Sequence, residues 1–435
     1  MTKAHFIGIG GVGMSALAQM LKQEGWGVSG SDRESGPTTE LLEERGIRVS
    51  IGQKAENVPA DTDVVIYSDA VVEGSEGFPE RLRARELGIR ELSYFEMLGE
   101  VSRGTSTSSG QGRKTIAVAG THGKTTTTGM LAKILTDAGA SPTAVIGSIV
   151  KDFGSNYLAG TSDLFVVEAC EYKDHLLELS PKILVVNNIE WDHTDYFPSL
   201  AALQETFKRA IEKVPADGVI VIDPKSPNIA PLLVGARARI VDYTQEPAYA
   251  LHLPGEFNQS NARAAAAAAR CALPRITDTQ VREALTRFHG TWRRFEYKGK
   301  NKNGADVYDD YAHHPTAVRE TLRALRAKVG GKIVVAFHPH LYSRTRDLLD
   351  EFSTAFAYAD QVYIAPIYAA REVDNGSISS EILAERIRAS GTDAITLDSF
   401  EVIEHTLAEI GEGDTIMTMG AGDIYKVADA LVARK

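Results

Sequence analysis

Short apolar runs alternate with helix-like segments through the first hundred residues of the chain. Apolar runs of a few residues between amphipathic segments are typical of βαβ units. The expected elements are His5 to Ile9, a helix from about Met14 to Glu24, Gly27 to Ser29, Leu41 to Arg45, Arg48 to Ile51, and Val64 to Tyr67. This pattern predicts an α/β domain with a doubly wound, mostly parallel sheet.

Two further α/β blocks follow a polar segment. Residues 102–112 are rich in Ser, Thr and Gly and lack an apolar period, which is typical of a flexible linker. Later strands are expected at Ile116 to Ala119, Leu164 to Val167, Ile183 to Val186, Val219 to Ile222, Ile333 to Phe337, Val362 to Ala365 and Thr415 to Met419, with helices at Asn261 to Cys271 and Asp278 to Phe288. We therefore predict three α/β domains at residues 1–103, 114–289 and 290–435, with a linker at residues 104–113.

Composition narrows the class of protein. The 435 residues carry a formal net charge of −11, which argues against nucleic acid as the main partner. No apolar run is long enough to span a membrane, and the N-terminus lacks a charged region followed by an apolar core, so we expect a cytoplasmic protein without membrane insertion. Cys170 and Cys271 are the two cysteines, too few for a disulfide framework or a multi-cysteine metal cluster.

The strongest chemical signal is the string GTHGKTT, which lies between an apolar strand and a helix-like segment. Its glycines let backbone N–H groups turn toward a polyphosphate, Lys124 offers a charge for the β- and γ-phosphate oxygens, and the Thr125 hydroxyl can ligate Mg²⁺. Val118 stands where the full phosphate-loop motif has its first glycine, and an ordinary Gly-rich turn is the alternative. The residues expected to bind ATP or GTP are Gly120, Thr121, His122, Gly123, Lys124, Thr125 and Thr126.

A second glycine motif opens the chain. Gly8, Gly10 and Gly13 fit the G-x-G-x-x-G pattern between a strand and a helix, and Asp32 ends the next strand. Such a turn places a diphosphate at a helix N-terminus and leaves the carboxylate free to accept a ribose hydroxyl. A dinucleotide cofactor and a UDP-sugar both offer these groups, and close packing of helix on strand is a third explanation.

Carboxylates and a histidine follow two strands of the second block. Glu168 comes directly after the expected strand Leu164 to Val167, and Glu171 lies three residues later. His193 follows the expected strand Ile183 to Val186. The carboxyl ends of parallel strands collect ligand-binding groups. With Thr125, these residues offer oxygen and imidazole ligands for Mg²⁺, although each alone fits an ordinary solvated loop equally well.

Three clusters of charged residues and histidines occur in the last block. They are the strings GTWRRFE, DDYAHHP and FHPHLYSRTR, which begin at Gly290, Asp309 and Phe337. Their arginines could neutralise a transferring phosphate or bind a carboxylate, although an arginine pair is most often a solvated surface.

With these strings in this order, the chain resembles the Mur ligase family of peptidoglycan synthesis over nearly all of its length. The strings that carry the resemblance are HFIGIGGVGMSALA, GTHGKTTTT, EACEY, NNIEWDH, DDYAHHPTAV, HPHLYSRTRDL and MGAGDIYKV. The resemblance implies an N-terminal Rossmann-like domain for the UDP-sugar, a central phosphate-loop ATPase domain and a C-terminal Rossmann-like domain. Within the family, the strings are most similar to the branch that uses ATP and Mg²⁺ to join L-alanine to UDP-N-acetylmuramate through an acyl phosphate.

The resemblance also implies a set of site residues. The residues implied in catalysis are Lys124, Glu168, His193, Arg294 and His340; those in ATP binding besides the loop are Asn258, Asn261, Arg294, Asp310 and His313; and the metal ligands are Thr125, Glu168 and His193. The residues implied in substrate binding are Gly10, Gly11, Val12, Gly13, Met14, Ser15, Ser31, Asp32, Ser68, Asp69, Glu171, Tyr172, His340, Arg344 and Arg346.

Three alternatives stay open at this point. A recycling ligase that joins the tripeptide L-Ala-γ-D-Glu-meso-diaminopimelate to the same UDP-sugar is the nearest, because the string NNIEWDH is similar to that branch. An NAD-dependent dehydrogenase would explain the N-terminal glycines but not Lys124, Thr125 or Glu168. A non-enzymatic ATP-dependent switch is the third alternative. For the oligomeric state, we expect a monomer or a homodimer.

Overall fold

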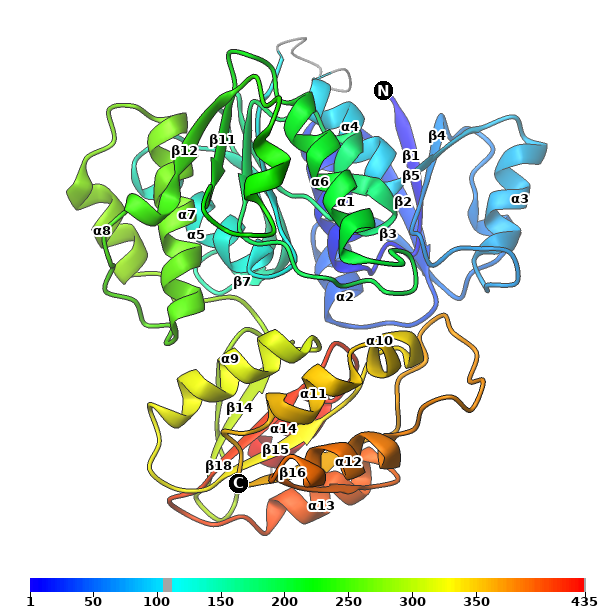
Figure 1. Cartoon of the computed structure of the whole chain (residues 1–435). Coiled ribbons are helices and arrows are strands. Elements are labelled where there is room, and N and C mark those ends of the chain that lie inside the picture. Colours follow the sequence, from blue (N-terminus) through cyan, green and yellow to red (C-terminus); the bar gives the residue numbers. More distant parts are fainter. Residues whose placement is uncertain (105–111, 434–435) are drawn as a thin grey trace. The chain divides into compact units, whose positions relative to one another are not determined.

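The chain folds into three α/β domains, each with its own mostly parallel sheet (Figure 1). The computed structural model describes residues 1–104 and 112–433. Contacts divide the chain into two compact units, described separately below. The first unit comprises Met1–Ile189, Gln204–Ala250 and Ser260–Phe288, and the second comprises Glu190–Leu203, Leu251–Gln259 and His289–Lys435.

The N-terminal sheet has five parallel strands in the order β3-β2-β1-β4-β5. Its elements are β1 (Lys3–Ile7), α1 (Val12–Gln23), β2 (Gly27–Asp32), α2 (Pro37–Glu44), β3 (Arg48–Ile51), η1 (Ala55–Asn57), β4 (Val64–Tyr67), α3 (Phe78–Glu86), β5 (Arg90–Ser93) and α4 (Tyr94–Arg103). Strand β1 ends at Ile7, two residues before the expected end, because Gly8 turns the chain at a φ of 82°. This turn brings the glycine loop to the carboxyl edge of the sheet.

The central sheet has seven strands in the order β12-β11-β10-β6-β9-β7-β8, and β8 alone among them is antiparallel to its neighbour. Its elements are β6 (Lys114–Ala119), α5 (Lys124–Asp137), β7 (Thr143–Val150), β8 (Ser155–Leu158), β9 (Leu164–Glu168), η2 (Tyr172–Glu178), β10 (Ile183–Val186), α6 (Leu200–Lys213), β11 (Val219–Ile222), η3 (Ala230–Leu233), β12 (Arg239–Asp242), η4 (Tyr243–Gln245), α7 (Glu256–Ala272) and α8 (Asp278–Thr286). Strands β6, β9 and β10 are adjacent, so the segments that follow them meet at one edge.

The C-terminal sheet has six strands in the order β13-β14-β18-β15-β16-β17, with β13 antiparallel to β14. Its elements are β13 (Glu296–Lys300), β14 (Asp306–Asp310), α9 (Pro315–Arg326), β15 (Ile333–Phe337), α10 (Tyr342–Asp347), α11 (Leu349–Ala355), β16 (Gln361–Ile364), α12 (Ser380–Ala389), β17 (Asp393–Thr396), α13 (Phe400–Ala408), β18 (Thr415–Met419) and α14 (Tyr425–Ala433).

Alternating side chains of β15 supply the two cores of this sheet. Ile333 and Val335 belong to one buried cluster, with residues of α9, α11 and α12. Val334 and Ala336 belong to a second cluster, with residues of α13 and α14. Because successive side chains of a strand point to opposite faces, a nearly continuous apolar run is what a sheet covered on both faces requires.

The predicted elements agree with the structure in part. Six predicted strands have the observed bounds: β3, β4, β10, β11, β15 and β18. The polar segment 102–112 is not linker at its start, because Ser102 and Arg103 belong to α4, where Ser102 is 2% exposed. The linker bounds 104–113 stay a prediction, and residues 105–111 lie outside the described part of the chain. Seven strands were not predicted: β5, β7, β8, β12, β13, β14 and β17. Of these, β13 and β14 were missed because their polar residues form an antiparallel hairpin at the sheet edge.

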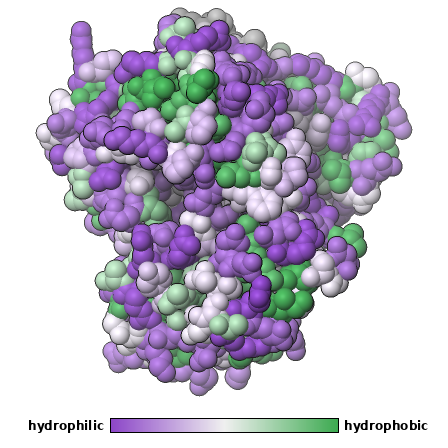
Figure 2. Space-filling model, viewed as in Figure 1, coloured by the Kyte–Doolittle hydropathy of each residue, from purple (hydrophilic) through white to green (hydrophobic). Residues whose placement is uncertain are grey.

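Most of the surface seen in Figure 2 is hydrophilic, with smaller groups of hydrophobic residues between. Among the residues that the structure describes, no helix has the length and apolar character needed to cross a membrane.

Candidate functional site

The loop between β6 and α5 has the geometry of a phosphate-binding turn. Gly123 precedes α5 with a φ of 82°, and a Cβ atom there would lie 2.1 Å from Oδ1 of Asn261. Both the backbone conformation and the space therefore require glycine at this position. Helix α5 begins at Lys124, so its N-terminal N–H groups follow the loop directly.

Two asparagines that follow β10 hold this loop in place. The Asn188 carbonyl accepts a hydrogen bond from the Thr121 N–H at 3.0 Å, and its Oδ1 accepts one from the His122 N–H at 2.8 Å. The Asn187 amide donates to the His122 carbonyl at 3.2 Å and to Oγ1 of Thr127 at 3.0 Å. The sequence contained both residues in the NNIEWDH string, but nothing in their spacing predicted these contacts.

Lys124 reaches from α5 back over the loop. Its Nζ donates to the Gly120 carbonyl at 2.6 Å and lies 2.9 Å from both carboxylate oxygens of Glu171, which is fully buried. Burial alone would lower the pKa of Lys124, but the charges of Glu171, Cys170 and Glu168 together raise it. The lysine therefore keeps its charge at neutral pH.

Thr125 and Glu168 bring two oxygen ligands together beside the loop. The Thr125 hydroxyl donates to Oε1 of Glu168 at 3.2 Å, and the Gly147 N–H donates to Oε2 at 2.9 Å. A hydroxyl and a carboxylate at a helix N-terminus form a donor set that fits Mg²⁺. Thr126, one residue along α5, is buried at 5% exposure.

The N-terminal glycine loop is held by the end of β2. The Ser31 carbonyl accepts hydrogen bonds from the N–H groups of Gly8 and Ile9, each at 2.9 Å. Oδ2 of Asp32 accepts one from the Gly10 N–H at 2.7 Å. The Ser31 hydroxyl is buried and donates to Oε2 of Glu80 at 2.8 Å, a contact that the sequence did not predict.

Helix α1 begins directly after this loop. Gly11 is its N-cap, and Val12, Gly13, Met14 and Ser15 form its first turn. The Asn156 amide of the central domain donates to the Val12 carbonyl at 2.5 Å and to the Ser15 hydroxyl at 3.0 Å. Within the first unit, the glycine loop of the N-terminal domain is thus tied to the central sheet.

A second contact within the first unit involves the turn after β4. Ser68 begins this turn, and Oδ2 of Asp69 lies 3.0 Å from Nε2 of His175 in η2. The His175 ring stacks on Phe95 with centroids 3.8 Å apart, and Tyr172 meets it edge-on. The predicted substrate residues Asp69 and Tyr172 therefore share one neighbour.

In the second unit, the segment that carries His193 is tied to α10. Oδ1 of Asp192 accepts hydrogen bonds from Nε of Arg344 at 2.8 Å and from the His193 N–H at 2.6 Å. Burial alone would raise the pKa of Asp192, but Arg344 and nearby histidines hold it well below its ordinary value. The pair is therefore ionised, and the two predicted site residues Arg344 and His193 converge on one carboxylate.

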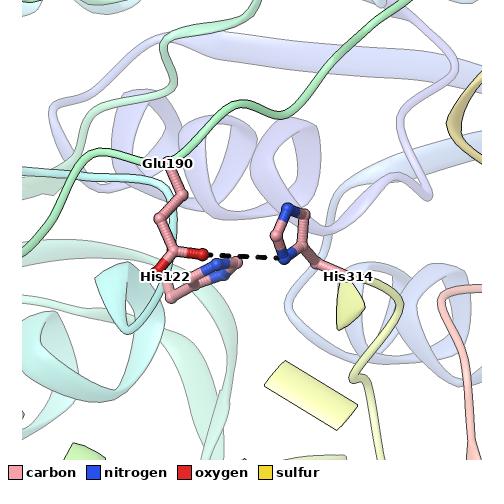
Figure 3. A group of neighbouring side chains, drawn as sticks. All are labelled: His122, Glu190 and His314. Carbon is pink, nitrogen blue, oxygen red and sulfur yellow. Dashed lines mark ion pairs between the residues drawn. The ribbon is translucent and has the colours of Figure 1, made fainter. Parts of the chain in front are cut away.

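His314 adds a further contact to this segment. Oε2 of Glu190 lies 3.9 Å from Nδ1 of His314, which is 4% exposed (Figure 3). The other ring nitrogen, Nε2, lies 3.1 Å from the Trp191 carbonyl. The side chain of His314 also caps α9, since Nδ1 accepts the Thr316 N–H at 3.3 Å.

His340 and His313 lie near Arg344 with their rings 6.1 Å apart. Nδ1 of His340 is 3.1 Å from Nη1 of Arg344. Burial lowers the pKa of His340 to about 3, and the Arg344 charge contributes. The same two causes hold the pKa of His313 well below its ordinary value. Both imidazoles are therefore neutral at pH 7 and available as hydrogen-bonding groups.

Asp310 ends β14 beside the predicted ATP residue Arg294. Its carboxylate accepts the N–H groups of Phe295 at 2.6 Å and Ala312 at 2.7 Å. Burial raises the pKa of Asp310 to about 6, although the Arg294 charge opposes the shift. The Arg294 guanidinium lies 4.8 Å from the centroid of the Tyr311 ring.

Three other predicted residues have neighbours of their own. Arg346 pairs with its neighbour Asp347 at 2.7 Å and is 43% exposed, and Asn258 donates to the Pro254 carbonyl at 2.8 Å. Asn261 lies in the first unit, against Gly123.

Three family models match the chain in order. The Mur ligase family catalytic domain matches residues 3–105, the Mur ligase middle domain matches residues 118–249, and the Mur ligase glutamate ligase domain matches residues 293–422. The chain belongs to the Mur ligase family. A curated relative from Acetivibrio thermocellus, described as UDP-N-acetylmuramate–L-alanine ligase, is 39% identical over 99% of this chain and 96% of its own.

Solved structures give the same family. A UDP-N-acetylmuramate–alanine ligase from Thermotoga maritima superposes with a TM-score of 0.79 at 27% identity, covering 100% of this chain and 99% of the other. A murein peptide ligase from Psychrobacter arcticus gives 0.74 at 25% identity, covering 100% and 98%. This Mur ligase therefore shares its three-domain architecture with both branches that the sequence left open.

Proposed function

We propose that this Mur ligase joins the amine of L-alanine to the lactyl carboxylate of UDP-N-acetylmuramate and uses ATP to do so. The observation that carries the proposal is the 39% identity over 99% of the chain to a relative described as UDP-N-acetylmuramate–L-alanine ligase. The charged Lys124, which begins α5 directly after the glycine loop, supports the use of ATP independently of that likeness.

The proposed reaction has two displacements. The lactyl carboxylate attacks the γ-phosphorus of ATP, ADP leaves, and an acyl phosphate forms. The amine of L-alanine then attacks the acyl carbon, inorganic phosphate leaves, and the amine nitrogen gives up a proton. In the first step, Lys124 would stabilise the charge on the transferring phosphoryl oxygens.

We propose Thr125, Glu168 and His193 as the ligands of Mg²⁺. When bound, Mg²⁺ would neutralise charge on the phosphate oxygens. The hydroxyl–carboxylate pair of Thr125 and Glu168 supports the first two ligands. His193 belongs to the second unit, and its place as a ligand rests on the family resemblance.

The remaining proposed roles rest on the family resemblance. Arg344 carries a buried cation that suits the carboxylate of an amino acid, and the neutral His340 lies beside it. Arg294, Asp310 and His313 are proposed on the ATP side, and the glycine loop with Asp32, Ser68 and Asp69 on the UDP-sugar side.

The recycling reaction is a second candidate, because the murein peptide ligase from Psychrobacter arcticus has a similar fold at 25% identity. It would use the same UDP-sugar and ATP but take a tripeptide in place of L-alanine. The two reactions therefore differ in the amine alone.

Phosphate release by the full-length protein tests both candidates. The assay contains ATP, Mg²⁺ and UDP-N-acetylmuramate, with L-alanine, glycine, L-serine or L-Ala-γ-D-Glu-meso-diaminopimelate as the amine. We expect the highest kcat/KM with L-alanine. A preference for the tripeptide would establish the recycling reaction, and no turnover with any amine would overturn both candidates. Thermal stabilisation by NAD but not by UDP-N-acetylmuramate would favour a dehydrogenase.

Because the proposed substrates are nucleotides of the cell interior, we propose that the reaction takes place in the cytoplasm. A monomer or a homodimer stays a prediction, which sedimentation of the purified chain would test.

A further inference from the structure

Arg293 carries a buried guanidinium and directly precedes the predicted ATP residue Arg294. It is 4% exposed, and its Nε donates to Oδ2 of Asp309 at 2.9 Å. Its Nη1 and Nη2 donate to the carbonyls of Gly422 at 2.8 Å and Gly420 at 2.5 Å. One side chain thus joins the end of β14 to the glycine turn that follows β18.

The backbone around Arg294 is strained on both sides. Arg293 has a φ of 59° and Phe295 has a φ of 48°, values that residues other than glycine rarely adopt. Such strain persists only where surrounding contacts overdetermine the conformation, and it concentrates at functional sites. Here two left-handed residues flank the one arginine for which we propose an ATP contact.

Hydrogen bonds on each side hold this conformation. The Arg293 N–H donates to Oε2 of Glu296 at 2.9 Å, and the Arg293 carbonyl accepts the Tyr311 N–H at 2.7 Å. On the other side, the Phe295 N–H donates to Oδ2 of Asp310. The buried guanidinium anchors the first of these residues, so its loss would release the turn that aims Arg294.

The ring of Tyr311 connects the two arginines. The Arg293 guanidinium lies 5.2 Å and the Arg294 guanidinium 4.8 Å from its centroid. Arg293 also lies 4.7 Å from the Tyr425 centroid, at the start of α14. All three distances are within the range of cation–π attraction, so the position of Arg294 depends on the Tyr311 ring, which Arg293 also contacts.

We propose that Arg293 is a positioning residue that fixes the direction of Arg294 toward ATP. The inference rests on the proposed function, in which Arg294 contacts the nucleotide. A guanidinium is needed because its planar fork donates along three directions at once, to a carboxylate and to two backbone carbonyls. An ammonium at the same place keeps the charge but cannot reach all three acceptors.

Four full-length variants test this: R293K, R294K, the double variant R293K/R294K, and R388K as the matched control. Arg388 likewise donates to one backbone carbonyl, that of Ala394 at 2.6 Å, and to one carboxylate, that of Glu381 at 2.8 Å. Neither contact involves a predicted site residue. ATP affinity is measured by calorimetry without sugar or amino acid, and kcat/KM for ATP by phosphate release.

We expect R293K to weaken ATP affinity and kcat/KM for ATP about tenfold, with KM for UDP-N-acetylmuramate changed less than about twofold. R388K should match wild type. If Arg293 acts through Arg294, the double variant loses no more than R294K alone, because coupled residues are not additive. Losses that multiply in the double variant, or an R293K that behaves like R388K, would overturn the proposal.

Two further results keep the test decisive. D309N removes the charge partner of Arg293 but leaves both carbonyl contacts, and it should weaken ATP affinity in the same direction if R293K does not fold. An unchanged ATP affinity in folded D309N would then overturn the proposal. Absence of turnover by wild type would contradict the proposed function, whereas the calorimetric comparison of the variants would still judge the role of Arg293.

Discussion

Both carboxylate oxygens of Glu171 lie 2.9 Å from Nζ of Lys124, and the carboxylate is fully buried. A buried ion pair is strongly destabilised when one partner is lost, because the other charge stays behind without compensation. Lys124 is therefore held as a cation at the point where the loop of residues 120–123 meets α5. This arrangement supports its proposed role in phosphoryl transfer.

Lys124→Ala should lower kcat for phosphate release by at least about a hundredfold, because it removes the cation proposed to stabilise the transferring phosphoryl group. The matched control is Lys133→Ala on the same helix. Lys133 is 14% exposed and pairs with Asp137 at 2.7 Å, away from the loop. K133A should keep wild-type turnover; near-normal turnover by K124A would exclude the proposed role.

Gly123→Ala and Gly139→Ala separate steric fit from backbone strain. Both glycines have a φ of 82°, so alanine costs about 1 kcal/mol of backbone strain at either position. A Cβ atom at Gly123 would also lie 2.1 Å from Oδ1 of Asn261, whereas nothing lies within 4 Å at Gly139. We expect G123A to lose ATP binding in calorimetry and G139A to retain it. Equal ATP affinities would show that the loop tolerates the clash.

Much of the site around the loop of residues 120–123 was predictable, because ligand-binding residues of a parallel sheet lie at the carboxyl ends of its strands. Glu168 ends a predicted strand and Lys124 begins a helix, so local pattern places both at the carboxyl edge of the central sheet. The NNIEWDH string was found for the same reason, since it follows β10. Asp310 ends β14, a strand that the pattern did not predict, and the family resemblance alone pointed to it.

The contacts that hold these groups were not predictable. Asn188 accepts a hydrogen bond from the His122 N–H, which is 66 residues away in the sequence. Arg293 donates to Gly422, 129 residues away, and Glu80 accepts from Ser31, 49 residues away. Each depends on which elements pack together and not on local spacing. Their polar side chains look like surface residues in the sequence, and only burial by distant segments shows otherwise.

Glu168→Gln should weaken Mg²⁺ binding, because it removes the negative charge from the proposed oxygen pair with Thr125. Calorimetric titration of Mg²⁺ into the ATP-bound protein should show affinity reduced by at least about tenfold. Glu178→Gln at the end of η2 is the control and should bind Mg²⁺ as wild type does. Unchanged affinity in E168Q would remove Glu168 from the proposed ligand set.

Asp192→Asn should destabilise the second unit much more than Asp195→Asn. The side chains of Asp192 and Arg344 are 5% and 2% exposed, so the variant leaves a buried guanidinium without its counter-charge and costs about 3 kcal/mol. Arg371, the partner of Asp195, is 46% exposed, and an exposed pair contributes less than about 1 kcal/mol. Urea denaturation of both variants measures the difference. Similar losses would mean that the Asp192–Arg344 pair is not the buried anchor we describe.

Acid should destabilise the C-terminal domain partly through His338. Burial lowers the pKa of this imidazole from 6.5 to about 4, and the side chain is only 6% exposed. Between these two values the unfolded chain binds more protons than the native one at this residue. The stability that the neutral imidazole contributes is therefore complete above pH 6.5 and is lost as the pH falls toward 4.

His338→Asn should remove this dependence. Between pH 7 and pH 5 wild type should lose about 2 kcal/mol more unfolding free energy than H338N. The difference arises because pH 5 lies about 1.5 units below the unfolded pKa of 6.5, and each unit is worth about 1.36 kcal/mol. Other buried histidines, such as His313, are present in both proteins, so their contributions largely cancel in the comparison. His405→Asn, at an exposed position of α13, is the control and should lose as much as wild type. Urea denaturation at the two pH values decides the matter, because equal losses in wild type and H338N would mean that His338 takes up its proton without unfolding.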